Sequence, residues 1–369
     1  MILQRSWALL LALLGCASGA AIPSNDGFPS PSTQQQLSIA KDAGGLLPNV
    51  PLPTKLGPGS KTTFQLIAFN ELFEVAFFDS LLQNITQGVE GYKIKAHKEK
   101  ITKIVTTVRA QEEQHAIAAD AALKTAGEFS PPACQYQFPT TDLAGAIRLA
   151  ETFTAIVLGA LQGANVVFAR ENQTVPIQLI SSVIGQEGEQ NGFYRHLIRQ
   201  VPSESPFLTA VPAAFAFSAL QLFVVPGSCP FPLSDIDLPV LPALAVNGGP
   251  VAVIEPKDQR LSFSADLTGA KDCEKHVGSD GAKLWLTYTT GQQKPISVSI
   301  DNVKWSGKQI SFDADFPFEK NVMVGFSHAA LTSARDFKTV DDIVCATVAA
   351  PAIIQVENSS DCKKLADDI

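Results

Sequence analysis

Four long stretches with apolar residues at every third or fourth position constrain the fold of this chain more than any other feature. They span residues 62–87, 97–126, 141–163 and 176–199. This spacing places the apolar side chains on one face of a helix. Residues that favour turns separate the stretches, namely Gly91, Pro131, Pro132 and Asn172. The pattern predicts four helices packed as a bundle.

The second stretch carries a carboxylate and an imidazole among the apolar residues that should face the core. Glu112 and His115 continue the helical spacing that Val108 sets. An ionised carboxylate left unpaired in an apolar interior costs several kcal/mol. Burial of these two groups therefore requires a compensating cation or a dense hydrogen-bond network.

The other three stretches also place carboxylates on their apolar faces. The residues concerned are Glu71, Glu74, Glu151 and Glu187. Carboxylates that meet inside a bundle repel one another strongly unless a divalent metal ion neutralises them. A Glu-x-x-His pair such as Glu112 and His115 suits this role, because positions i and i+3 share a helix face and bind one metal together. The sequence thus predicts a carboxylate metal site inside the bundle.

Several segments of the chain resemble one family of secreted helical proteins. The segments are Asn70–Phe78, Glu112–His115, the helix around Glu151, Gln186–Arg195 and Ser228–Pro230. They are similar to secreted ferritin-like proteins, a group that includes fungal late sexual development and stress-response proteins and plant desiccation-related proteins. The resemblance covers residues 62–230 and implies a ferritin-like four-helix bundle that holds two iron or manganese ions. In such families two helices each supply a glutamate and the other two each supply Glu-x-x-His.

The resemblance implies a role for each inward-facing carboxylate. Carried over by position, the bridging ligands are Glu112 and Glu187, the terminal ligands are Glu151 and either Glu71 or Glu74, and the imidazole ligand is His115. The fourth helix departs from the family pattern, because Gln190 stands where the second histidine is expected. His196 cannot replace that histidine, since it faces the opposite side of the helix from Glu187. Gln190 remains a candidate ligand through its amide oxygen, but a weaker one, so the two-metal site is expected to be incomplete.

A hydrogen-bond network without metal is the alternative explanation for the buried carboxylates. Arg148, Tyr194 or water would then hold glutamates retained from a metal-binding ancestor. Three other histidines lack partners at ligand spacing and are expected to be ordinary surface or core residues, namely His97, His276 and His328. Glu113 and Glu189, next to the proposed ligands, are expected to point into solvent.

After Cys229 the chain changes to short runs in which apolar and polar residues alternate. The runs span residues 251–254, 260–266, 283–289, 295–300, 309–313 and 321–326. Alternation with a period of two is typical of strands, and Gly and Asp turn signals separate the runs. The region 231–357 is predicted to form an antiparallel β-sandwich, so the whole chain is expected to be mainly α with a β-rich C-terminal domain. Since this region has no cluster of nucleophiles or ligands, a packing role or the binding of a cell-wall or protein partner is its default function.

The N-terminus has the order of a secretory signal. A charged start, the apolar run 7–14 and small residues up to Ala20 predict a signal peptide of residues 1–20. Residues 21–61, rich in Pro, Ser, Gly and Gln, are predicted to be an extended, poorly packed linker, and residues 358–369 to be a polar tail. The apolar segment 206–225 contains Pro212 and is expected to pack on the bundle, so no membrane span is predicted after signal removal.

Secretion exposes the chain to glycosylation and to disulfide formation. Sequons are present at Asn84, Asn172 and Asn358. Removal of the signal leaves the cysteines at positions 134, 229, 273, 345 and 362. Because their number is odd, at least one is expected to stay unpaired or to pair between chains. The sequence leaves the pairing of these cysteines open.

The charge of the chain gives no electrostatic basis for nucleic-acid binding, since the formal net charge is −8 and the pI is about 5.2.

The features above, together with what the resemblance implies, predict a secreted ferritin-like protein of sexual development or stress response with an incomplete two-metal carboxylate site. The alternative is a non-catalytic extracellular or cell-wall protein that no longer binds metal. The sequence leaves open whether a reaction is catalysed and how many chains assemble.

Overall fold

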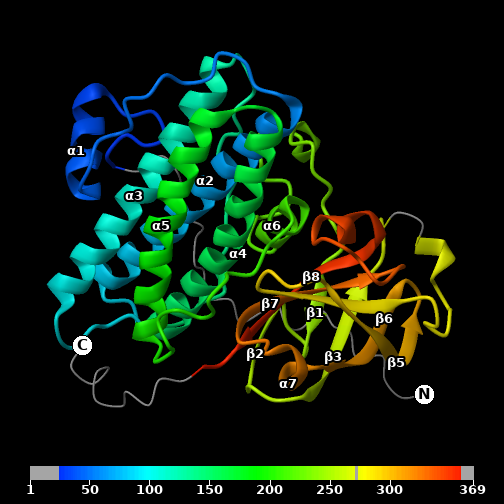
Figure 1. The fold of residues 1–369 in the computed structure, drawn as a ribbon. Coiled ribbons are helices and arrows are strands. Elements are labelled where there is room, and N and C mark those ends of the chain that lie inside the picture. Colours follow the sequence, from blue (N-terminus) through cyan, green and yellow to red (C-terminus); the bar gives the residue numbers. More distant parts are fainter. Residues whose placement is uncertain (1–24, 271–272, 359–369) are drawn as a thin grey trace.

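The computed structural model describes residues 25–270 and 273–358, which form a helical half and a strand half (Figure 1). The helices of the first half are α1 (Thr33–Ala43), α2 (Pro58–Gln87), α3 (Lys98–Thr125), α4 (Leu143–Arg170), α5 (Thr174–Leu197) and α6 (Ala213–Leu220). The strands are β1 (Leu244–Val246), β2 (Val251–Ile254), β3 (Gln259–Asp266), β4 (Trp285–Thr290), β5 (Ile296–Ser306), β6 (Gln309–Phe316), β7 (Gly325–Thr332) and β8 (Thr347–Val356). Short helical turns are η1 (Leu233–Asp235), η2 (Cys273–Lys275), α7 (Phe318–Asn321) and η3 (Asp341–Ala346). The predicted signal peptide and residues 359–369 of the predicted tail lie outside the described residues.

The four predicted helical stretches all form helices, at bounds close to the predicted ones. Helix α2 packs against α3 and α4, and α4 packs against α5, so the four long helices lie side by side in Figure 1. Local sequence sets the start of α4, because the Asp142 side chain accepts a hydrogen bond of 2.8 Å from the Gly145 amide. Residues 126–142 form a long crossover from α3 to α4, whereas a short turn joins α4 to α5.

The segment before α2 is not the extended, poorly packed linker that its composition predicts. It contains α1, which starts with a capping box between Ser32 and Gln35 and packs against α3. Phe28 is buried in an apolar cluster with Leu72 and Val75 of α2. Composition was misleading here because a few apolar side chains among the prolines reach the helical core.

The apolar segment 206–225 packs on the helical half, as predicted. Only part of this segment is helical, namely α6, and this helix contacts α2, α4 and β8. Among the residues that the structure describes, α4 is the one helix long and apolar enough to cross a membrane, and 61% of its apolar window is buried inside the protein. A place in the core accounts for the composition of α4.

The strands form one continuous sheet with the order β1-β3-β6-β5-β4-β7-β8-β2. The long strand β5 joins the two halves of the sheet, because residues 296–299 pair with β4 and residues 300–306 pair with β6. At the two ends of the sheet β1 lies against β8 and β2. Asn247 and Gly248, both with positive φ, make the tight turn from β1 to β2. The sheet therefore curls into an almost closed, barrel-like shape around its own apolar core.

The prediction of an antiparallel β-sandwich is not confirmed. The strands belong to one curled sheet, and β2 pairs with β8 in parallel. Strands such as β3 and β6 do show the predicted alternation of buried and exposed residues. This alternation is the same in a sandwich and in a barrel-like sheet, so the sequence period could not distinguish the two.

Strands β7 and β8 connect the sheet to the helices. Both are buried along nearly their whole length, since one face covers the core of the sheet and the other packs against the helical half. Phe326 of β7 and Ile353 of β8 belong to the same apolar cluster as Phe73 of α2 and Phe217 of α6. The two halves therefore share one core.

His328 of β7 lies in this shared region, and its burial has a consequence for stability. Its Nε2 group donates a hydrogen bond of 3.0 Å to the Ala210 carbonyl, whereas Nδ1 has no hydrogen-bond partner. Burial lowers the pKa of His328 from 6.5 to about 4, and the bond to Ala210 offsets only part of this effect. As the pH falls through this window the unfolded chain takes up a proton before the folded protein does, so the free energy of unfolding decreases.

We expect the wild-type protein to lose about 2 kcal/mol more free energy of unfolding than His328→Gln between about pH 7.5 and about pH 5. The reason is that glutamine has no proton to gain in this range. Urea denaturation of both proteins at the two pH values measures the difference. Equal losses would contradict a neutral, desolvated His328.

Candidate metal centre

Four of the predicted ligands meet between α2, α3 and α5. They are Glu71, Glu112, His115 and Glu187, and their ligand atoms all lie within 4.8 Å of one another. The Nδ1 atom of His115 is 2.9 Å from Glu112 Oε2, 3.6 Å from Glu71 Oε2 and 3.8 Å from Glu187 Oε1. The i to i+3 spacing places Glu112 and His115 on one face of α3, where the carboxylates of α2 and α5 meet them.

The carboxylates of this cluster are buried and poorly compensated. Glu71, Glu112 and Glu187 are 0% exposed, and both carboxylate oxygens of Glu71 and of Glu187 lack a hydrogen-bond partner. Burial raises the pKa of Glu71 to about 6, although His115 counteracts it. Burial and the neighbouring charges of Glu71 and Glu112 raise the pKa of Glu187 well above its ordinary value.

For His115, burial and the neighbouring charges act on the pKa in opposite directions. Burial alone would lower the pKa of its imidazole, but the carboxylates of Glu112 and Glu71 outweigh burial and raise the pKa well above its ordinary value. The buried carboxylates of the cluster therefore favour the binding of positive charge, either as protons or as a metal cation.

Two further candidate ligands border the cluster. Glu74 accepts a hydrogen bond of 2.9 Å from Asn70, and burial followed by the charge of Glu112 raises its pKa well above its ordinary value. Gln190 donates from Nε2 to Glu112 at 2.8 Å and accepts at Oε1 from the Tyr194 hydroxyl at 3.3 Å. Its amide oxygen is thus used by Tyr194, and its N–H group orients a ligand, so Gln190 supports the cluster without joining it.

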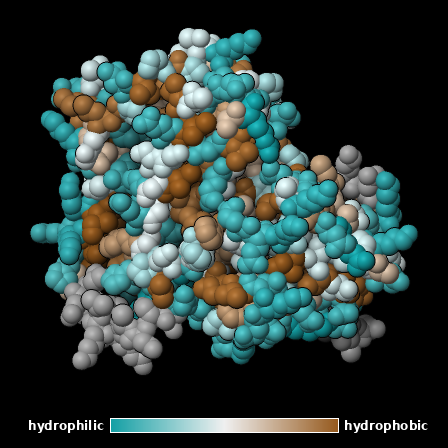
Figure 2. Space-filling view, viewed as in Figure 1, coloured by the Kyte–Doolittle hydropathy of each residue, from teal (hydrophilic) through white to brown (hydrophobic). Residues whose placement is uncertain are grey.

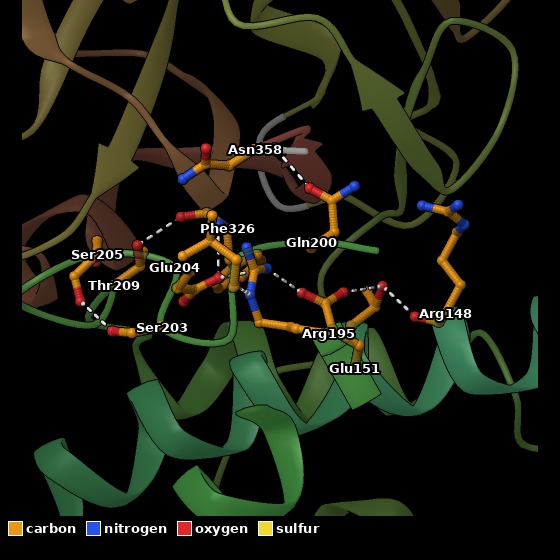
Figure 3. Close-up of polar contacts among 12 residues, drawn as sticks. Arg148, Glu151, Arg195, Gln200, Ser203, Glu204, Ser205, Thr209, Phe326 and Asn358 are labelled. Atoms are coloured by element: carbon orange, nitrogen blue, oxygen red, sulfur yellow. Dashed lines mark hydrogen bonds and ion pairs between the residues drawn. The ribbon is translucent and has the colours of Figure 1, made fainter. Parts of the chain in front are cut away.

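Glu151 lies outside the cluster and pairs with an arginine of α5. Arg195 Nη1 is 2.7 Å from Glu151 Oε1 and 3.5 Å from Glu204 Oε2, and Arg195 Nε donates to the Val201 carbonyl at 2.8 Å. Figure 3 shows the Arg195 side chain reaching toward the Glu151 carboxylate, with Glu204 and Phe326 on its other side. Burial raises the pKa of Glu151 to about 7, although Arg195 counteracts it. The structure therefore gives Glu151 an ion-pair role in place of the predicted ligand role.

Comparison with known families agrees with this helical architecture. Residues 63–200 match the model of a family described as a ferritin-like domain. Residues 63–200 are therefore similar to a ferritin-like domain. The matched segment holds all the predicted ligands and the four long helices almost completely. No curated protein matches the chain.

The described residues bring one cluster of carboxylates and an imidazole together, and this cluster is compatible with a metal site. Three carboxylates and one imidazole converge on one point, which is a suitable donor set for iron or manganese. The second set lacks two donors, because Arg195 holds Glu151 and Gln190 replaces the second histidine. The unpartnered oxygens of Glu71 and Glu187 fit a bound cation, since an uncompensated buried carboxylate is costly.

Glu113 does not point into solvent as predicted, whereas Glu189 does. Glu113 is buried with Oε1 3.6 Å from Arg109 Nε, and Arg109 also pairs with Asp26 at 2.5 Å and Asp79 at 3.2 Å. Burial raises the pKa of Glu113 to about 8, although Arg109 counteracts it. The prediction is wrong because the segment before α1, which its composition predicts to be a linker, covers this side of α3.

The ion-pair role of Arg195 is not among the predictions from sequence, although the sequence contains a signal for it. Arg195 stands on the same stripe of α5 as Glu187, Asn191 and Tyr194, and all four are buried. A cation on this stripe predicts an ion pair with an inward carboxylate of a neighbouring helix. Glu204 had no comparable signal, because it lies in a loop without periodicity.

The sequons and the remaining histidines occupy ordinary positions. Asn172 is exposed in the turn between α4 and α5, Asn84 is half-buried in the last turn of α2, and Asn358 is half-buried just after β8. The sequon of Asn358 continues outside the described residues. His97 is exposed and His276 half-buried. Glycosylation at the three asparagines stays a prediction, and Asn172 has the most accessible side chain for it.

Proposed function

We propose that the ferritin-like domain binds one divalent transition-metal ion through Glu71, Glu112, His115 and Glu187. The observation that carries this proposal is the convergence of three fully buried carboxylates on one imidazole, with both oxygens of two carboxylates unpartnered. A mixed set of carboxylate and imidazole donors suits iron or manganese.

The residues around the centre have separable roles in this proposal. Glu71 and Glu187 bind through oxygens that accept no hydrogen bond from the protein. Glu112 is held in place by the 2.8 Å hydrogen bond from Gln190. Iron or manganese, when bound, supplies Lewis acidity and a change of oxidation state. Because the second donor set is incomplete, binding and retention of metal is the role we propose, in preference to the chemistry of a metal pair.

We further propose that the protein acts outside the cell, in sexual development or stress response. The signal-like N-terminus and the sequons support secretion, and the disulfide between Cys134 and Cys229 is typical of an oxidising compartment. The developmental or stress role rests on the resemblance to secreted ferritin-like proteins.

A non-catalytic structural or cell-wall-binding protein without metal is the second candidate. The specific observation that favours it is the Arg195–Glu151 ion pair, because one expected donor is there paired with an arginine. In this candidate the curled sheet would hold the cell-wall or protein partner.

Metal analysis of the purified full-length protein tests the first proposal. We expect about one iron or manganese ion per chain in wild type and in Glu189→Ala, which alters an exposed carboxylate of α5. Glu112→Ala should retain little metal, because it removes a buried ligand. Metal at 100 times its dissociation constant should also raise the free energy of unfolding by about 2.7 kcal/mol. Equally negligible metal in wild type and Glu112→Ala would reject the proposal and leave the second candidate.

A further inference from the structure

A cavity of about 310 Å³ adjoins the metal centre. Glu71 and His115 lie at one part of its wall, and the rest is formed by α2, α3, α4, α5, the end of α1 and the segment that follows α1. Its volume is at the lower end of the range for small-molecule pockets in proteins. The cavity therefore gives a ligand direct access to two residues of the centre.

Most of the wall is apolar. Phe64 and Ile67 of α2, Leu161 of α4, and Ile180 and Val183 of α5 line it. Hydrophobic residues also reach the surface of the helical half over α3 and α5 (Figure 2). An apolar chain placed in this cavity would remove both its own surface and this wall from water.

Several polar groups of the wall are acceptors that lack hydrogen-bond partners. Both oxygens of the fully buried Glu71 are unpartnered, and so are the buried amide oxygens of Gln114 and Gln186. Their amide nitrogens are already used, since Gln114 donates to the Gly45 carbonyl and Gln186 donates to Gln111. The vacant acceptors suit a ligand that brings a hydroxyl donor.

We propose that this cavity binds a neutral apolar molecule with a terminal hydroxyl group, such as a medium-chain alcohol. The apolar chain lies along the wall of α2, α4 and α5, and the hydroxyl group lies at Glu71 and His115. A carboxylate ligand is disfavoured, because three carboxylates with one divalent ion already leave a net negative charge. The part of the inference that places the hydroxyl group at the metal rests on the proposed function, whereas the apolar part does not.

Calorimetric titration of the full-length protein with octan-1-ol tests the cavity. Ala118 is a partly buried residue of α3 that lines it, and Ala121 is a partly buried residue of α3 that does not. We expect Ala118→Phe to bind octan-1-ol about tenfold more weakly or worse, and Ala121→Phe to bind it as wild type does. Ser182→Phe, at an exposed position of the wall, should weaken binding without disturbing the core.

The outcomes distinguish binding of the alcohol in the cavity from binding of a metal ion at the centre. Equal binding of octan-1-ol by wild type, Ala118→Phe and Ser182→Phe would overturn the proposal, and so would octanoate binding as tightly as the alcohol. In protein loaded with Co²⁺, octan-1-ol should change the visible absorption of the metal in Ala121→Phe but not in Ala118→Phe. If wild type retains no Co²⁺, the proposed function fails, and the calorimetric comparison still decides the cavity.

Discussion

Replacing Arg195 with methionine is expected to lower the free energy of unfolding by about 3–5 kcal/mol, because it leaves Glu151 and Glu204 buried without a counter-charge. The three side chains are at most 3% exposed, and Arg195 is 2.7 Å from Glu151. Burial raises the pKa of Glu151 to about 7 even with Arg195 present, and it also raises the pKa of Glu204. Urea denaturation at neutral pH measures the loss.

Two comparisons separate the ion pair from general damage to the helices. Arg148→Met, at a partly exposed position of α4, should change the free energy of unfolding by no more than about 0.5 kcal/mol. Adding Glu151→Leu to Arg195→Met should restore part of the loss, since one unpaired carboxylate is removed. A loss below about 1 kcal/mol in Arg195→Met would contradict the view that the pair compensates a buried charge.

Removing the disulfide is expected to have an effect of similar size. Cys134 and Cys229 are 95 residues apart in sequence and lie 4.2 Å apart between their Cα atoms. Closing a loop of this length restricts the unfolded chain, so replacing both cysteines by serine should lower the free energy of unfolding by about 4 kcal/mol. The backbone contact beside the disulfide remains, because Gln137 donates to the Phe223 carbonyl at 2.8 Å and Val225 donates to the Gln135 carbonyl at 2.9 Å.

The matched control uses the exposed free cysteine Cys345. Cys345→Ser should leave the free energy of unfolding within about 0.5 kcal/mol of wild type. Both variants are compared with wild type by urea denaturation without reductant. If the double serine variant were as stable as Cys345→Ser, the disulfide would not contribute to the folded state under these conditions.

The helical half could be predicted because the residues that recur at helical spacing are also the residues that are buried. The stripe through Val108, Glu112 and His115 is buried or half-buried as its spacing predicts, and Glu71 and Glu187 meet it from neighbouring helices. Period alone did not distinguish a metal ligand from an ion-pair partner. Glu151 has the same inward position as Glu187, and only the position of Arg195 in space separates their roles.

Burial by distant segments could not be predicted from local pattern. Glu113 was expected to be exposed because it lies off the apolar stripe of α3, yet the segment that contains Asp26 covers it. The closure of the sheet is a similar case. It depends on β1 meeting β8 and β2 across the barrel-like shape, and residue alternation within each strand carries no information about such a contact.

Because β7 and β8 share a core with the helices, the part of the chain that folds together is longer than the part that matches the family model. The family match ends at residue 200, but the helical half buries Phe326 and Ile353 from the far end of the chain. A chain shortened to the matched segment would expose this apolar surface to water and invite aggregation. The loop containing Glu204 reinforces the same connection, since its carboxylate accepts a hydrogen bond from the Phe326 amide at 3.0 Å. The ferritin-like domain is thus expected to express and denature together with its sheet, as one cooperative unit.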